Sequence, residues 1–148
     1  MKIGKPGPKR YVAAALVSSN QIAVIPLSPS TCALGTVTTI ATSVTPSGVP
    51  AGVDFSPKSD ILYVGDAAFT TKVEAFAFPT GTPLAGSPYT YSLGSDSSTV
   101  LASKDGQCLF VANQFSSGVT SIPLSGGIPR ATAKFFPAGF GGLVRCSM

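Results

Sequence analysis

The stretch that decides the fold is Val53-Asp-Phe-Ser-Pro-Lys-Ser-Asp-Ile-Leu-Tyr-Val64, which returns in altered form as Val100-Leu-Ala-Ser-Lys-Asp-Gly-Gln-Cys-Leu-Phe-Val111. A shorter copy opens the chain around Gly7 and Tyr11-Val12. The copies recur at intervals of about 50 residues, a period typical of architectures whose units bury their apolar faces only against neighbouring units. Each copy has one aromatic anchor, Tyr11, Tyr63 or Phe110, and we predict that these side chains pack between neighbouring units.

Each repeat contains the pattern of four short strands. An apolar strand follows every anchor after a polar hairpin, as in Ile22–Leu27, Val73–Phe78 and Val119–Leu124. Residues rich in β-branched and aromatic types, bounded by Ser, Asn and Gly, favour strands joined by tight turns. Turns rich in Gly and Pro come next, and a further strand follows each one: Pro88–Leu93 in one unit and Thr132–Phe136 in the next.

Both ends of the chain can be aligned with the same repeat pattern. Pro137–Ser147 aligns without gaps on Pro46–Ser56, so the C-terminal segment corresponds to the strand that opens a fourth repeat. At the other end, Ile3-Gly4 aligns with Phe55-Ser56, near the close of the same strand. The sequence therefore predicts about three units, each taking its opening strand from the end of the preceding period.

Length and composition agree with a single all-β body. The 148 residues include 13 prolines and 16 glycines, only 11% are charged, and no stretch has a sustained helical period with caps. We assign residues 1–8 to a Pro/Gly/Lys-rich leader and residues 9–148 to the repeats. The net charge of +4 comes from four residues near the N-terminus, because the other six basic residues balance the six acidic ones. These four are Lys2, Lys5, Lys9 and Arg10. No aromatic residue stands among these charges to stack a base, so we interpret them as solvated and predict no nucleic-acid partner.

Targeting signals and cysteines give little further guidance. The apolar run Tyr11–Val17 is short for a signal peptide and has no clear cleavage site, and no run approaches the roughly 20 apolar residues of a membrane span. The compartment is therefore left open. Cys32, Cys108 and Cys146 are an odd number without metal-type spacing, and we interpret them as small hydrophobes rather than as disulfide or reactive groups.

These repeats resemble a known family. Ser56-Pro57 with Leu62-Tyr63-Val64, the run Leu109–Asn113, and the run Ser19–Val24 are similar to the YVTN-type repeat of β-propellers, and in particular to the seven-bladed, lactonase-like propellers grouped with 6-phosphogluconolactonase. The resemblance implies four-stranded antiparallel blades around a channel, with Gly48–Phe55 innermost and its small residues in the crowded centre. An extracytoplasmic location is compatible with it.

Three repeats are too few to close a seven-bladed ring. An open arc would leave large apolar sheet faces uncovered, and such patches are rare on soluble monomers. Three accounts remain: a fragment of a longer propeller, which we favour; ring completion by assembly of the chain with itself; and an open arc of low stability. The partners we expect are therefore the missing blades or a second copy.

The candidates for chemistry are few. The chain has no histidine, the commonest general base and metal ligand, and it lacks a phosphate loop, a nucleophile elbow and a zinc pattern. We therefore predict no cofactor, no metal and no catalytic residue. Asp54 and Arg145 share one position of the innermost strand, so they are our candidates for a ligand contact in the channel or for a mutual ion pair. We interpret Asp66 and Asn113 as turn caps.

The resemblance implies that lactonase members use basic, acidic and histidine side chains at the channel mouth. This sequence offers no full set. We therefore predict a non-catalytic binding or structural scaffold. The alternative is a fragment of a lactonase-like hydrolase acting on sugar lactones, with its catalytic residues in missing blades.

Overall fold

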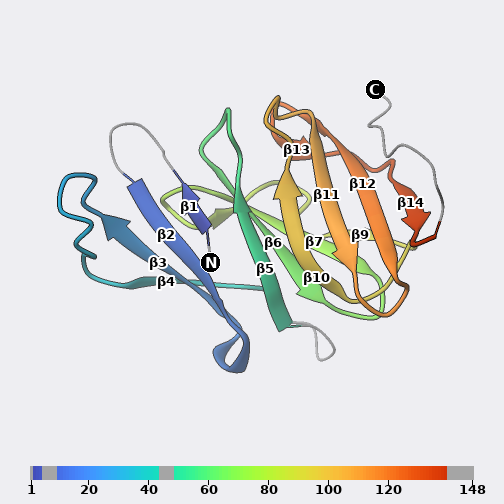
Figure 1. Ribbon diagram of the computed structural model, residues 1–148, viewed down its shortest axis with the longest axis horizontal. Helices are drawn as coiled ribbons and strands as arrows, with labels where there is room; N and C mark the ends of the chain where they lie inside the picture. The colour runs from blue at the N-terminus through green and yellow to red at the C-terminus, as the bar shows by residue number, and fades with distance from the viewer. Residues whose placement is uncertain (1, 5–9, 44–48, 140–148) are drawn as a thin grey trace.

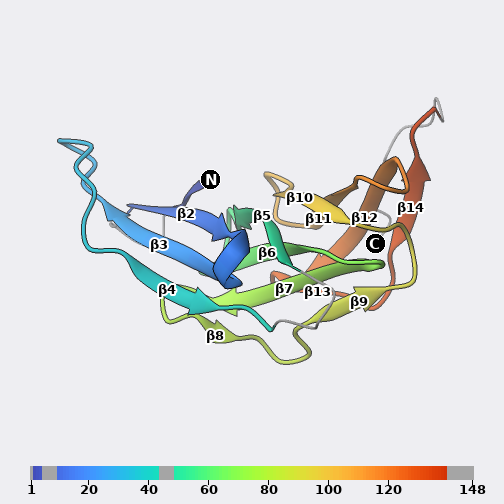
Figure 2. The ribbon, with the colours of Figure 1, turned by 90° about the horizontal axis from the view of Figure 1, so that it is seen from below.

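Each repeat forms one antiparallel sheet, and the three sheets lie side by side as the blades of an incomplete propeller (Figure 1). The computed structural model describes residues 2–4, 10–43 and 49–139. Seen from below, the blades follow a curved path, with β2, β5 and β10 along one margin and β4, β8 and β9 along the other (Figure 2). None of the described residues forms a helix long and apolar enough to cross a membrane.

The strands of each blade follow one another in sequence. Blade 1 contains β1 (Lys2–Gly4), β2 (Arg10–Leu16), β3 (Gln21–Leu27) and β4 (Thr38–Ala41), with a short 3-10 turn, η1 (Val17–Ser19), between β2 and β3. Blade 2 contains β5 (Val49–Phe55), β6 (Ile61–Ala67), β7 (Thr71–Ala77) and β9 (Tyr89–Tyr91). Blade 3 contains β10 (Ser97–Ala102), β11 (Cys108–Asn113), β12 (Gly118–Ser125) and β14 (Lys134–Pro137). The predicted four-stranded blades are confirmed.

Two short strands were not predicted. β8 (Thr82–Pro83) pairs with the end of β7, and β13 (Ile128–Pro129) pairs with the end of β12. Both lie in the Gly/Pro-rich segments that the sequence assigned to turns. A two-residue strand is too short to produce an alternating pattern, which is why sequence reading takes it for part of the turn.

The first blade differs from the expected register. Lys2–Gly4, inside the predicted leader, pairs with β2 as the inner strand, and Ile3 lies opposite Val12. In blade 2, Val53 lies opposite Val64, which is the repeat equivalent of Val12. Ile3 therefore corresponds to Val53, two residues before the Phe55 position given by gapless alignment. The expected opening strand of a fourth repeat falls largely on 140–148, outside the described residues.

Two hydrophobic cores join the blades. The core between blades 1 and 2 includes Tyr11, whose ring packs edge-to-face on Phe78 with 4.9 Å between centroids. The core between blades 2 and 3 includes Tyr63, which has no exposed surface. Both faces of β7 are buried, because blade 2 has a neighbour on each side. The prediction that the aromatic anchors pack between blades is confirmed for Tyr11 and Tyr63, whereas Phe110 is half-buried and belongs to neither core.

The inner strands approach closely, as predicted for a crowded centre. A Cβ on Gly52 of β5 would lie 2.7 Å from the Cα of Thr99 in β10. Because that neighbour is backbone, no rotamer change can relieve the clash. Glycine at this position therefore lets blades 2 and 3 meet.

Candidate functional site

The sequence placed Asp54 at the channel, and the structure places its carboxylate between two blades. Asp54 lies on β5, is 8% exposed, and accepts a 2.9 Å hydrogen bond from the amide of Ala102 on β10. Its other oxygen accepts from the amide of Phe55, at 2.9 Å. Asp54 thus joins blade 2 to blade 3. Its role in ligand binding stays a prediction, and Arg145 lies outside the described residues.

The repeat position of Asp54 explains this contact. Val53 packs in the core between blades 1 and 2, so its neighbour Asp54 points to the opposite face of the sheet, toward blade 3. Leu101 is the equivalent residue of blade 3, where Val100 packs toward blade 2. Leu101 is 48% exposed. This position therefore faces the next blade along the ring.

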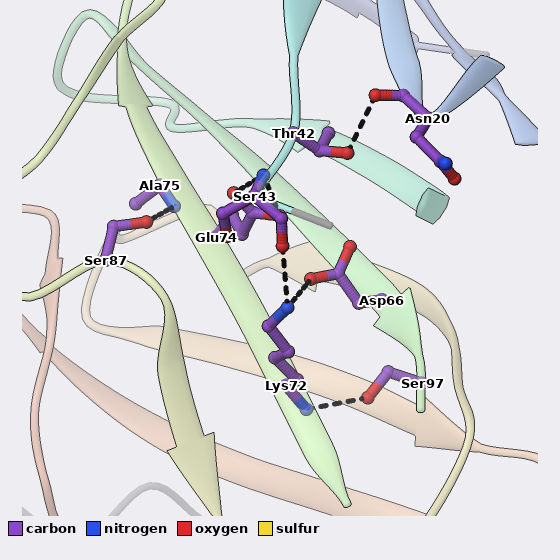
Figure 3. A network of polar contacts seen from close by, with 9 residues as sticks. All are labelled: Asn20, Thr42, Ser43, Asp66, Lys72, Glu74, Ala75, Ser87 and Ser97. Carbon is purple, nitrogen blue, oxygen red and sulfur yellow. Dashed lines mark hydrogen bonds and ion pairs between the residues drawn. The ribbon is translucent and has the colours of Figure 1, made fainter. Parts of the chain in front are cut away.

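A second set of charged side chains lies between blades 1 and 2 (Figure 3). The ammonium of Lys72 on β7 is 3.2 Å from Oδ2 of Asp66 on β6, and it donates to the carbonyl of Ser43 at 3.0 Å. Glu74 accepts the amide of Ser43 through both carboxylate oxygens, at 2.9 and 3.1 Å. Asp66, Lys72 and Glu74 are at most 5% exposed. We call these three residues with Ser43 the buried charge cluster.

The hairpin register brings the cluster together. Asp66 lies directly opposite Lys72 in the β6–β7 pair, at the hairpin end of both strands. Glu74 is two residues further along β7, so it shares a face with Lys72. This is the face of Leu62 and Phe76, which belong to the core between blades 1 and 2. Blade 1 therefore covers all three charges.

Burial shapes the electrostatics of the cluster. Loss of hydration, followed by the negative charge of Glu74, raises the pKa of Asp66 to about 7, against an opposing effect of Lys72. Asp66 and Lys72 form a close ion pair, with the negatively charged Glu74 beside it. Two carboxylates beside one ammonium leave an excess negative charge, which a proton on Asp66 removes.

Blade 3 has a neutral counterpart of this cluster. Asn113 is the repeat equivalent of Asp66, and Thr120 that of Glu74. Asn113 donates to the hydroxyl of Thr120 at 2.8 Å and accepts from the hydroxyl of Thr71 at 2.7 Å. Both sets place polar groups beside an apolar core, but the set around Asn113 and Thr120 is neutral, whereas the buried charge cluster is ionic.

The interpretation of Asp66 as a turn cap is wrong, because its carboxylate faces a cation and has no backbone partner. Asn113 does donate to the nearby carbonyl of Val111, at 3.2 Å, but it also bonds across the blade interface. The cluster was missed because Lys and Glu on a strand usually face solvent. The hairpin register could have revealed it, because pairing β6 with β7 places Asp66 opposite Lys72.

The cysteines also differ from expectation. Cys108 takes part in a disulfide bond, so its interpretation as an unpaired small hydrophobe is wrong. Cys32 is free and exposed rather than buried. Cys146 lies outside the described residues. Within the described ranges, no group of three or more His, Cys, Asp or Glu side chains could hold a metal ion.

The buried charge cluster holds charge away from solvent, at the junction of two blades. Proton exchange between Asp66 and solvent would require the junction to open, because the carboxylate is 2% exposed. A substrate has no access to these groups while blades 1 and 2 are in contact. The chemistry that this arrangement supports is pairing between blades.

Comparison with known proteins identifies the fold family. Residues 9–141 match the model of the family described as lactonase, 7-bladed beta-propeller. No curated protein matches the chain in sequence.

Similar solved structures include propellers with different described roles. One is a putative 6-phosphogluconolactonase from Bacteroides uniformis, with a TM-score of 0.66, 17% identity, and coverage of 93% of this chain and 42% of that one. Another is a periplasmic gluconolactonase from Pseudomonas aeruginosa, with a TM-score of 0.58, 24% identity, and coverage of 90% and 41%. A third is a chain of a nidogen/laminin complex, with a TM-score of 0.67, 13% identity, and coverage of 87% and 45%.

At these identities the solved structures establish a common fold, and the chain spans less than half the length of each. The family match covers most of the sequence, and the three sheets are consistent with part of a seven-bladed propeller. The chain belongs to the lactonase family of seven-bladed β-propellers.

Proposed function

We propose that this chain acts as a non-catalytic propeller scaffold, a structural or binding segment of a larger ring. The observation that carries this proposal is the use of its buried charges. Asp54, Lys72 and Glu74 all make contacts that join one blade to the next. The sequence also has no histidine to serve as a general base. These three side chains could do acid–base work, but their contacts serve to hold blades together.

The proposal extends to what covers the ends of the arc. On β11, Leu109 and Val111 pack toward blade 2, so Phe110 between them points to the outer face of blade 3. Leu101 lies directly opposite Phe110 in the β10–β11 pair and shares that face. The equivalent residues of blade 2, Asp54 and Tyr63, contact blade 3. We infer that further blades of a longer chain, or a second copy, cover Leu101 and Phe110.

A turnover assay tests the scaffold proposal. The chain alone, incubated with gluconolactone and followed by acid release at constant pH, is expected to match the rate in buffer. Asp54→Asn is the comparison variant, because Asp54 is the described candidate from the innermost strand. Turnover above buffer that this substitution reduces would contradict a non-catalytic role.

A second candidate is a segment of a lactonase-like hydrolase acting on sugar lactones. It is favoured by the names of two similar structures, a putative 6-phosphogluconolactonase and a gluconolactonase. The nidogen/laminin chain, from a complex between proteins, favours the scaffold instead.

The nucleotide sequence flanking the reading frame distinguishes the two candidates. Further repeats with His and Arg on their inner strands, together with turnover by the extended protein, would support the hydrolase. An extended protein without turnover would support the scaffold.

A further inference from the structure

A cleft of about 530 Å³ lies between blades 2 and 3, at the end of β6 opposite to the buried charge cluster. Three segments line it: the β5–β6 turn, the β10–β11 turn, and the end of β12 with the residues that follow. All three belong to blades 2 and 3, so the cleft is complete without any further blade. Its volume is within the range of small-molecule sites, roughly 300–1,000 Å³.

Two cations line this cleft from different blades. Lys58 comes from the β5–β6 turn and Arg130 follows β13. Within the described residues, neither side chain forms an ion pair within 4 Å or a hydrogen bond, although the charge of Lys58 helps to lower the pKa of Asp105. Asp105 also lines the cleft, but the Ser103 hydroxyl and the Gln107 amide bind its carboxylate and hold its pKa below the usual range. The positive groups are therefore the ones left to bind a ligand.

The wall that carries Arg130 is fixed to the neighbouring blade. The Tyr63 hydroxyl donates to the carbonyl of Gly127 at 2.6 Å, and the Tyr91 hydroxyl donates to the carbonyl of Arg130 at 2.7 Å. Gly127 has a φ of +84°, and a Cβ there would lie 2.6 Å from the hydroxyl of Ser59. The turn therefore fits its place only with glycine. A wall held in this way loses little freedom when a ligand binds.

The lining defines the chemistry of the ligand. Among the described residues of the lining, Leu124 is the one large apolar side chain, and the others are serine, glycine, glutamine and charged residues. Lys58 and Arg130 are not held in an ion pair or a hydrogen bond, and two such cations match a group with close to two negative charges, such as a phosphate monoester at neutral pH. Arginine presents a fork that binds two phosphate oxygens, and lysine adds a point charge. Serine hydroxyls suit the hydroxyl groups of the ligand body.

We propose that the cleft between blades 2 and 3 binds a small hydroxylated organic phosphate, with Lys58 and Arg130 holding the phosphate group. This site is separate from the channel and from lactone hydrolysis, and it is independent of how the ring is completed. The scaffold role and this site can therefore fail separately.

Amide resonances of the ¹⁵N-labelled chain test the site, with ribose 5-phosphate as the probe and ribose as its uncharged control. Ribose 5-phosphate is expected to produce saturable shifts at Gly106 and Gly127, at ionic strength held constant with chloride. Ribose is expected to produce none. The double variant Lys58→Gln, Arg130→Gln removes both charge-assisted contacts and is expected to weaken binding at least about tenfold.

Lys104→Gln is the matched control, because Lys104 is exposed on the same β10–β11 turn and does not line the cleft. This variant is expected to bind as the unaltered chain does. All substituted residues are on the surface, and their spectra report whether the fold is intact. If wild-type resonances are too broad, calorimetric titration with the same ligands replaces them. Unsaturable shifts, equal binding of ribose, or unchanged binding by the double variant would overturn the proposal.

Discussion

The carboxylate of Asp66 and the ammonium of Lys72 face each other across the β6–β7 pair, with 3.2 Å between Oδ2 and Nζ, and both side chains are almost fully buried. At the equivalent place in blade 3 the chain uses Asn113, a neutral residue of the same shape as aspartate. The same position of the repeat therefore accommodates a charged residue in one blade and a neutral residue in another. The natural occurrence of Asn113 in blade 3 suggests Asp66→Asn as the substitution that tests the role of the charge in blade 2.

Asp66→Asn is expected to change how stability depends on pH. Burial raises the pKa of Asp66 from 3.8 to about 7, so between these values the folded chain binds a proton that the unfolded chain releases. The free energy of unfolding therefore falls as pH rises from about 4 to 7, by an amount on the order of 1 to 4 kcal/mol. Asp66→Asn should remove this fall. Urea denaturation at pH 4.5, 6 and 8 measures it.

Asp60→Asn is the control for this experiment, because Asp60 lies exposed at the start of the same strand hairpin. Its pH profile is expected to follow that of the unaltered chain. An unchanged profile in Asp66→Asn would mean that the carboxylate does not hold a proton in the folded state.

Lys72→Met is expected to destabilise the chain at pH 8 by roughly 3–5 kcal/mol, the usual cost of leaving a buried charge without its partner. Asp66 and Glu74 would then face each other without a cation. The loss should be smaller at pH 5, where Asp66 is protonated. Lys104→Met, at an exposed position, should change the free energy of unfolding by less than about 0.5 kcal/mol. Equal effects of the two substitutions would contradict the buried charge cluster.

Gly52→Ala is expected to separate blades 2 and 3. The added Cβ would lie 2.7 Å from the backbone of Thr99, so the inner strands must move apart, at a cost of roughly 1–3 kcal/mol. Gly35→Ala is the milder comparison, since its nearest contact is a Pro26 side chain at 3.3 Å. Thermal unfolding of both variants gives the comparison, and a neutral Gly52→Ala would show that β5 and β10 are not in close contact.

The fold was largely predictable because the repeat fixes it several times over. Tyr11 and Tyr63 mark the same strand in two blades, and both are buried between blades, as their aromatic character and spacing suggested. The register of β1 was predicted less well. A gapless alignment cannot account for a connection that differs in length between blades. Ile3 and Val12 are two residues closer in the sequence than their equivalents Val53 and Val64.

The candidate sites were less predictable. The sequence pattern indicates the side of the sheet to which a residue points, but it does not indicate which other residues cover that side. Asp54 was correctly placed on an inner strand, but its contact with Ala102 depends on the next blade. Asp66 looked like a residue at the end of a strand, and only the partner strand and blade 1 make it part of a buried cluster. The cleft between blades 2 and 3 combines three turns that are distant in the sequence.

We propose that further blades or a second copy cover the end faces of this three-bladed arc, and the molar mass in solution tests this claim most directly. Light scattering during size exclusion is expected to give a mass above the 14.9 kDa of one chain. Leu101→Asp, on the outer face of blade 3, should lower that mass, whereas Phe115→Ser, at an exposed hairpin tip, should not. A monomer that binds no hydrophobic dye would contradict the claim.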